Sequence, residues 1–191
     1  MDVLFMVSPA QSYKKALLGS LILSLTLAII FLVPSLPLAS NKALQASFAS
    51  PSHQAMYVFF GFKACGDVCP NTLAKLALYR QEESDPGDTL GIYFIDIDRQ
   101  SNQASAIDYA KQFSTRFVGV HPSDVELATL SSNFNLNFAQ QEDSIRHQGR
   151  LYFAVKQGNK WFLQKTYNPG QFDRQDYGKD TQKFTANEAL Q

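Results

Sequence analysis

The chain has 191 residues, and its 17 basic and 17 acidic side chains give a formal net charge of zero. This balance excludes the basic surface expected of a nucleic-acid-binding protein, so no nucleic acid partner is predicted. Hydrophobic residues make up 45% of the sequence, which is typical of a globular fold. The chain has only two cysteines, which rules out both a disulfide-rich scaffold and a site built from four thiolates.

An apolar segment near the N-terminus predicts a membrane anchor. Residues 16–33 carry no charge, and a run of 18 residues is just long enough to span hydrocarbon. Lys14 and Lys15 precede this run and favour a cytoplasmic location for residues 1–15. We therefore expect one transmembrane helix over 16–38 in the inner (plasma) membrane, with the rest of the chain in the periplasm. A cleaved signal peptide and a buried core helix are the alternatives.

The remaining sequence predicts a tether, one domain and a polar tail. Residues 39–55 are rich in serine and alanine, as in a short tether. A domain is expected over 56–170, where strand-like and helix-like apolar patterns alternate. Residues 171–191 are polar and aperiodic, and we expect them to be frayed.

The order of the expected elements indicates the fold class. In chain order, the patterns predict strands over 56–62, 89–97, 117–120, 150–156 and 160–167, with helices over 70–81, 104–113 and 122–134. Strands that alternate with helices imply parallel pairing, and the closing hairpin adds antiparallel strands. The sequence thus predicts an α/β fold that resembles a thioredoxin-like mixed sheet with helices on both faces.

Cys65 and Cys69 lie between the first expected strand and the first expected helix of the domain. Pro70 favours a helix start here, which places Cys69 at a helix N-terminus with Lys63 nearby. These surroundings predict a lowered pKa for Cys69. A thiolate pair can be redox-active or can bind a metal ion, and its spacing alone does not choose between these functions. A purely structural disulfide is a third hypothesis, although so short a loop would add little stability.

Several segments resemble the Sco/SenC family. The matching segments are Phe60-Gly61-Phe62, the Cys-x-x-x-Cys-Pro motif at Cys65 to Pro70, Thr72-Leu73, Tyr109-Ala110-Lys111-Gln112-Phe113 and Phe117-Val118-Gly119-Val120. They occur in the family's order and span about residues 57–156. The resemblance implies a membrane-anchored copper protein with a thioredoxin-like fold, which assists assembly of the copper centre of cytochrome c oxidase.

The resemblance also supplies a third candidate ligand. The family has a distant histidine just before its final hairpin, and His147 occupies the matching position here. With Cys65 and Cys69, His147 would complete a copper site, because two thiolates and one imidazole suit Cu(I) and can also hold Cu(II). His53 is interpreted as a tether residue and His121 as a loop residue, and either could replace His147 as the ligand.

Three residues depart from the family pattern. The family has Asp-Pro-x-Arg-Asp after the second strand, whereas this sequence has Ile97 in place of the proline and Gln100 in place of the last acid. Arg146 replaces the acidic residue usual before the histidine, and its positive charge is expected to weaken cation binding. These changes indicate a divergent member whose copper affinity or partner can differ.

The sequence therefore predicts a copper chaperone that uses Cys65, Cys69 and His147. Its expected partner is a respiratory oxidase subunit or another copper or thiol protein. The main alternative is an enzyme, a periplasmic thiol-disulfide oxidoreductase with Cys65 and Cys69 as its redox pair. No proline lies between Pro122 and Pro169, where thioredoxin-type oxidoreductases place a cis-proline, and this absence favours metal binding. A divergent scaffold that retains little chemistry is the remaining hypothesis.

Overall fold

The computed structural model describes residues 9–32, 38–82, 89–141 and 144–188, and the chain divides into two units, 1–37 and 38–191. In the first unit, helix α1 (Pro9–Leu32) contains most of the apolar segment predicted to be an anchor. Within these described ranges, no helix is both long enough and apolar enough to cross a membrane. Parts of the predicted cytoplasmic segment and anchor, residues 1–8 and 33–37, lie outside the described residues.

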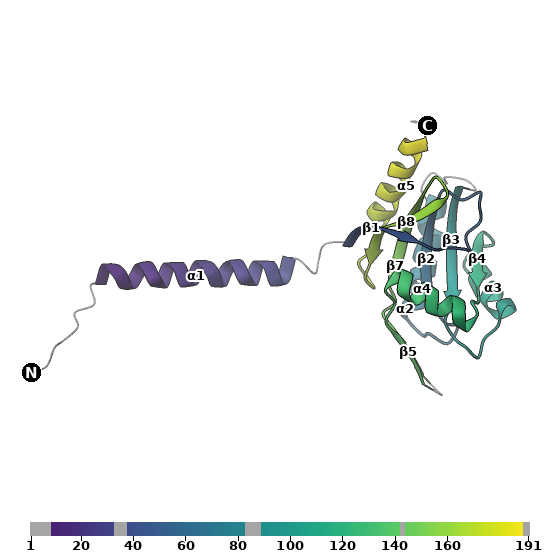
Figure 1. Ribbon diagram of the computed structural model, residues 1–191, viewed down its shortest axis with the longest axis horizontal. Coiled ribbons are helices and arrows are strands. Elements are labelled where there is room, and N and C mark those ends of the chain that lie inside the picture. Colours follow the sequence, from purple (N-terminus) through teal and green to yellow (C-terminus); the bar gives the residue numbers. More distant parts are fainter. Residues whose placement is uncertain (1–8, 33–37, 83–88, 142–143, 189–191) are drawn as a thin grey trace, which may run out of the picture. The chain divides into compact units, whose positions relative to one another are not determined.

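The second unit is built on a six-stranded mixed sheet with the strand order β1-β8-β7-β2-β3-β4 (Figure 1). Its strands are β1 (Leu38–Leu44), β2 (Ala55–Gly61), β3 (Leu90–Asp96), β4 (Phe117–Val120), β7 (Leu151–Gln157) and β8 (Lys160–Tyr167). Strands β2, β3 and β4 are parallel, and the other neighbours pair antiparallel. Strands β2 and β3 are buried along their full length, which explains their continuous apolar sequences.

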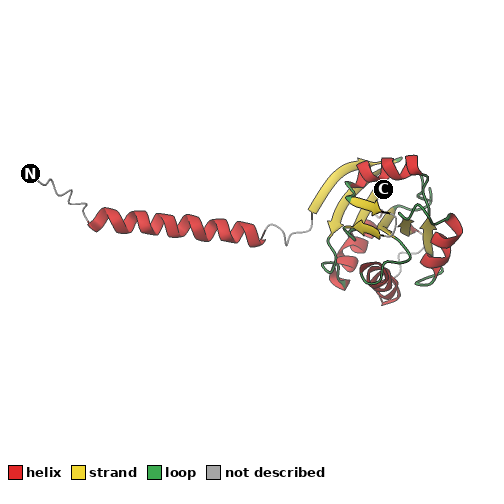
Figure 2. Cartoon of the chain, turned by 90° about the horizontal axis from the view of Figure 1, so that it is seen from below, coloured by secondary structure: helices red, strands yellow, loops and turns green. Residues whose placement is uncertain are grey.

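Helices lie on both sides of this sheet, as the sequence predicts (Figure 2). They are α2 (Val68–Glu82), α3 (Gln103–Lys111), α4 (Asp124–Phe134) and α5 (Arg174–Glu188). Side chains of α2, α3 and α5 form one core cluster with Tyr57 and Phe59, whereas α4 forms a second cluster with Met56 and Val58. Successive residues of β2 thus enter opposite core layers, because strand side chains alternate between the two faces. The predicted mixed α/β architecture is confirmed.

Part of the predicted tether is a strand of the sheet. Strand β1 pairs antiparallel with β8, and Leu44 lies opposite Trp161. Leu44 is buried and belongs to the same core cluster as α4. The tether prediction is therefore wrong over residues 39–44. Their sequence is not typical of a strand, but they gain stability by pairing with the edge of β8.

The predicted frayed tail is also wrong, because it contains helix α5. Tyr177 is fully buried, and its ring stacks on Tyr57 at a centroid distance of 5.7 Å. Asp180 accepts hydrogen bonds from the hydroxyl groups of Tyr57, at 3.0 Å, and Tyr167, at 2.7 Å, and it forms an ion pair with Lys165. One face of a polar helix is therefore fixed to the domain by a few specific contacts.

A two-stranded hairpin lies outside the six-stranded sheet, and the sequence patterns did not predict it. It consists of β5 (Phe138–Gln141) and β6 (Ser144–His147), which pair antiparallel with Phe138 opposite His147. Both strands are short, so their alternation is too brief to be recognised from sequence. This hairpin carries the candidate histidine ligand at its final residue.

Candidate metal centre

The two cysteines lie at the junction between β2 and α2, as predicted. Cys69 is the second residue of α2 and has no exposed surface, whereas Cys65 is half-buried in the preceding turn. The backbone N–H of Cys65 donates to the carbonyl of Phe62 at 3.1 Å, which fixes the turn. At Gly61, an added Cβ would lie only 2.7 Å from the Cys69 Sγ atom, so a glycine is needed for the sulfur to pack against β2.

The hairpin brings His147 directly to these two sulfurs. Its Nε2 atom lies 3.7 Å from the Cys65 Sγ atom and 3.6 Å from the Cys69 Sγ atom. The three potential ligand atoms all lie within 4.8 Å of one another. The ring of Phe62 contacts the imidazole edge to face at a centroid distance of 5.6 Å, which covers part of the group with apolar surface. Two soft thiol donors and one imidazole in this arrangement fit a thiophilic metal ion.

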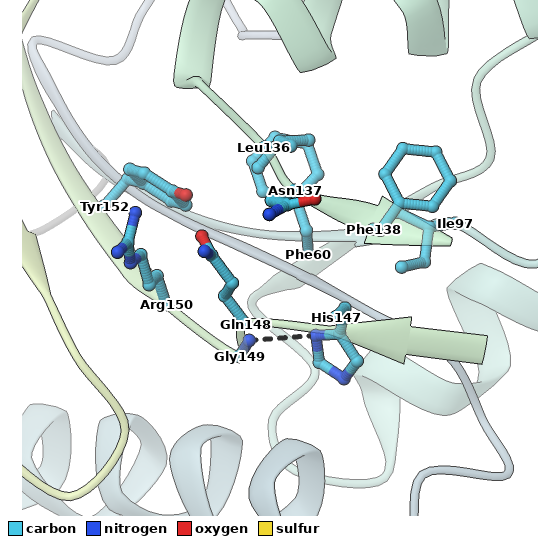
Figure 3. A pocket seen from close by; sticks show the side chains of 10 residues that line it. All are labelled: Phe60, Ile97, Leu136, Asn137, Phe138, His147, Gln148, Gly149, Arg150 and Tyr152. Carbon is cyan, nitrogen blue, oxygen red and sulfur yellow. Dashed lines mark hydrogen bonds between the residues drawn. The ribbon is translucent and has the colours of Figure 1, made fainter. Parts of the chain in front are cut away.

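The other ring nitrogen of His147 is held by the backbone (Figure 3). The N–H of Gly149 donates to Nδ1 at a distance of 3.0 Å. Because Nδ1 is the acceptor, the neutral ring carries its proton on Nε2, where it points toward the sulfurs. Burial lowers the pKa of His147, so the ring is uncharged at neutral pH. A neutral imidazole that held a metal ion at Nε2 would carry its proton on Nδ1 instead, which would release the hydrogen bond from Gly149.

The pKa of the Cys69 thiol is raised, whereas the sequence predicted a lowered pKa. Desolvation raises the pKa of Cys69 well above its ordinary value, and a hydrogen bond with Cys65 raises it further. The predicted lowering is wrong because Cys69 is enclosed in the core, where losing water outweighs the helix N-terminus. In the metal-free protein, Cys69 is a protonated thiol at neutral pH.

Neither of the other two histidines approaches the cysteines as a ligand. The Nδ1 atom of His53 is hydrogen-bonded to the Tyr93 hydroxyl at 2.6 Å. His121 follows β4, and its backbone N–H donates to Gln103 at 2.7 Å. Among the described residues, the only grouping of three potential metal ligands is the one containing His147.

The structure also shows how the three departures from the family pattern are placed. Ile97 is buried, with 1% exposure, and Gln100 is exposed. Arg146 is exposed and precedes His147 in β6, so the two side chains point to opposite faces of the hairpin. The arginine is therefore directed away from the sulfurs, and its expected effect on cation binding is weakened.

Two residues contact His147 without having been assigned this function from sequence: Phe62, which was noted only as part of a matching segment, and Gly149. Gly149 has a φ of +58°, and an added Cβ would lie 2.5 Å from the Val68 side chain at the start of α2. Only glycine fits a left-handed position this close to another element. A glycine two residues after the candidate histidine was the available signal.

The fold and the three side chains define a thioredoxin-like domain with a Cys-Cys-His group suited to metal binding. The SCO1/SenC family model matches residues 38–185, which is most of this domain. The chain belongs to the SCO1/SenC family.

The comparisons with individual proteins agree with this assignment. The mitochondrial Protein SCO2 homolog of Bos taurus is 30% identical over 114 residues, covering 55% of this chain and 43% of that protein. The chain thus matches less than half the length of this relative.

Two solved structures share the fold. Arabidopsis thaliana ScoI, solved with copper bound, has a TM-score of 0.58 at 21% identity, covering 70% of this chain and 85% of that one. BsSco has a TM-score of 0.56 at 15% identity, covering 78% of this chain and 95% of that one. It is described as a member of the Sco family of cytochrome c oxidase assembly proteins, with a disulfide switch.

Proposed function

We propose that this protein binds a copper ion through Cys65, Cys69 and His147 and delivers it during assembly of a respiratory oxidase. The observation that carries the proposal is the convergence of two sulfurs and one imidazole nitrogen within 4.8 Å. Copper is supported over other thiophilic metals by membership of the SCO1/SenC family and by the copper bound to the similar ScoI structure. Delivery to an oxidase is supported by the assembly role described for BsSco.

The unequal exposure of the ligands suits a protein that releases its metal. Cys69 is enclosed in the core and would bind the ion from the interior side, whereas Cys65 is half-buried at the surface. A thiol of an incoming partner can therefore compete first for the side occupied by Cys65. Copper supplies a soft Lewis acid that accepts thiolate ligands, and both thiols must lose their protons for it to bind.

Copper titration of the reduced full-length chain tests the proposal. We expect one copper ion per chain, and Cys65→Ala or Cys69→Ala should each lower the affinity by at least about 100-fold, because one thiolate and one imidazole leave a weak site. His147→Ala should weaken Cu(II) more than Cu(I), since two thiolates can satisfy linear Cu(I). His121→Ala is the matched control and should bind like wild type. Unchanged stoichiometry and affinity in both cysteine variants would disprove the metal site.

A thiol-disulfide reductase remains the second candidate function, because one cysteine is accessible and the other is buried against it. This asymmetry is typical of redox pairs in which an exposed thiolate attacks first and a buried thiol resolves the mixed disulfide. The disulfide switch described for BsSco also supports redox activity of the pair.

Insulin reduction separates the two functions. A copper chaperone should turn over insulin slowly, because another protein must reduce its cysteine pair. A reductase should be active in wild type and His147→Ala and inactive in Cys65→Ala. Rapid reduction that survives His147→Ala would replace the chaperone proposal with the oxidoreductase.

We also propose that the uncharged run at residues 16–33, most of which lies in α1, anchors the chain in the inner membrane, with residues 1–15 in the cytoplasm and the domain in the periplasm. The anchor expected over 16–38 is too long at its C-terminal end, because Leu38 pairs with Thr166 in the sheet. The support is the uncharged run after Lys14 and Lys15, together with the exposed apolar side chains of α1. Leu21 and Leu25, for example, are more than half exposed within this helix.

A further inference from the structure

The candidate centre is assembled from two separately supported parts. Cys65 and Cys69 are held by the main sheet and α2, whereas His147 belongs to the β5–β6 hairpin. The hairpin pairs with no strand of the six-stranded sheet in the part of the chain that the structure describes. The position of the imidazole therefore depends on the short connection to β7, on the hydrogen bond from the Gly149 N–H, and on side-chain contacts between the hairpin and the main body.

Gln140 makes one such contact from β5. Its Nε2 donates to the Asp98 carboxylate at 3.3 Å, and its Oε1 accepts from the backbone N–H of Arg99 at 3.4 Å. Both partners lie in the loop directly after β3, whose last residue, Asp96, pairs with Gly61 at the end of β2. The Gln140 carboxamide thus links the hairpin that carries His147 to the end of β3, which lies beside the end of β2 that precedes the cysteines.

The loop that receives Gln140 is itself fixed. The Asp98 carboxylate accepts the backbone N–H of Gln100 at 2.9 Å, and the backbone N–H of Asp98 donates to Asp96 at 3.1 Å. The Arg99 side chain forms an ion pair with Asp124 of α4 at 3.1 Å. Gln140 is therefore attached to a loop that is held by both β3 and α4.

Little free space separates the base of the hairpin, near His147, from the main body. A cavity of about 10 Å³ lies there, lined by Phe60, Ile97, Phe138 and His147 among others (Figure 3). This volume is at most that of one water molecule, so the hairpin base packs closely on the sheet. A change in the hairpin angle would consequently move His147 relative to the two sulfurs.

We propose that Gln140 is a positioning residue for the metal centre, which acts through His147 by clamping the hairpin to Asp98 and Arg99. The inference rests on the proposed copper site and assigns a function to the contact between β5 and the loop after β3. Its effect should be larger for Cu(II) than for Cu(I), because Cu(II) depends on the imidazole whereas two thiolates can satisfy Cu(I).

The test compares Gln140→Ala with Gln100→Ala in the reduced full-length chain. Gln100 is exposed and lies in the same loop, and its backbone rather than its side chain contacts Asp98. Gln140→Ala removes two long hydrogen bonds, and we expect it to weaken Cu(II) binding about fivefold, the low end of what two hydrogen bonds contribute. It should also reduce the nitrogen coupling in the Cu(II) EPR spectrum. Cu(I) affinity should be unchanged, and Gln100→Ala should match wild type in both measurements.

A double-variant cycle separates positioning from general destabilisation. In a His147→Ala background, Gln140→Ala should have no further effect on Cu(II) affinity, because the residue through which it acts is gone. Asp98→Ala breaks the clamp from the other side and keeps the test available if Gln140→Ala does not fold. Wild-type Cu(II) binding by Gln140→Ala, or a loss that persists without His147, would overturn the inference. Failure of wild type itself to bind copper would instead disprove the proposed function.

Discussion

At the scale of single residues, burial makes the two cysteines chemically different. Cys69 is enclosed and its pKa is raised by desolvation, whereas Cys65 is half-buried in the turn before α2. The helix N-terminus, which favoured a reactive Cys69 from sequence, does not compensate for the loss of water. Cys65 is therefore the thiol that meets reagents and partners.

This difference predicts the order in which the metal-free thiols are alkylated. Cys65 should react at least about tenfold faster than Cys69 with iodoacetamide near neutral pH, since only a thiolate with access attacks and each pKa unit changes the thiolate fraction tenfold. Peptide mapping by mass spectrometry would measure both rates in one sample. The Cys65→Ser and Cys69→Ser variants, which each retain one thiol, are the controls. Faster labelling of Cys69 would restore the interpretation based on the helix dipole.

At the scale of elements, α5 shows how a polar segment can be integral to the core. Its buried residues Tyr177, Asp180 and Thr181 follow the spacing of one helix face, and the other face is exposed. Asp180 is surrounded by two tyrosine hydroxyls and Lys165, so its burial is compensated by hydrogen bonds and an ion pair. The helix thereby closes one side of the sheet.

Removing the buried ring of α5 should destabilise the whole domain. Tyr177→Ala is expected to lower the free energy of unfolding by about 3 kcal/mol, the usual cost of deleting a buried aromatic ring. Chemical denaturation followed by circular dichroism would measure the change. Lys179→Ala, on the exposed face of the same helix, should change the free energy by no more than about 0.5 kcal/mol. Equal stability of the two variants would mean that α5 is frayed, as the sequence suggested.

Some elements could be predicted from the sequence and others could not, because the contacts that stabilise them differ in sequence separation. Strand β2 is apolar at every position, so its own residues are sufficient to predict a strand. Strand β1, the β5–β6 hairpin and α5 depend on partners far along the chain, such as Trp161 for β1 and Tyr57 for α5. Local composition cannot show such pairings.

The candidate site divides in the same way. The short spacing of Cys65 and Cys69 at a strand-helix junction was sufficient to identify them as a functional pair. His147 is 78 residues beyond Cys69, and it was singled out only through the family resemblance. The supporting contacts of Gly149 and Gln140 join segments whose proximity only the fold establishes.

At the scale of the whole molecule, the domain and α1 place opposite demands on their surroundings. The domain buries apolar side chains in two clusters, whereas α1 exposes large apolar residues between Leu17 and Ile29. Exposed apolar surface of this extent requires a lipid or protein environment. The membrane attachment proposed for α1 would meet this requirement.

The proposed membrane anchor can be tested by fractionation. The full-length protein should remain in the membrane pellet after alkaline carbonate extraction, and protease added from the periplasmic side should digest the chain beyond Ser40. Introducing Leu25→Lys with Ile29→Lys should move it to the supernatant, because each charge near the centre of a transmembrane helix costs about 3 kcal/mol. Ser24→Ala lies in the same run, adds no charge and should remain in the pellet. A soluble periplasmic product that begins near residue 40 would show instead that the apolar segment is a cleaved signal peptide. Retention of the double-lysine variant would show that attachment depends on a surface of the domain rather than on α1.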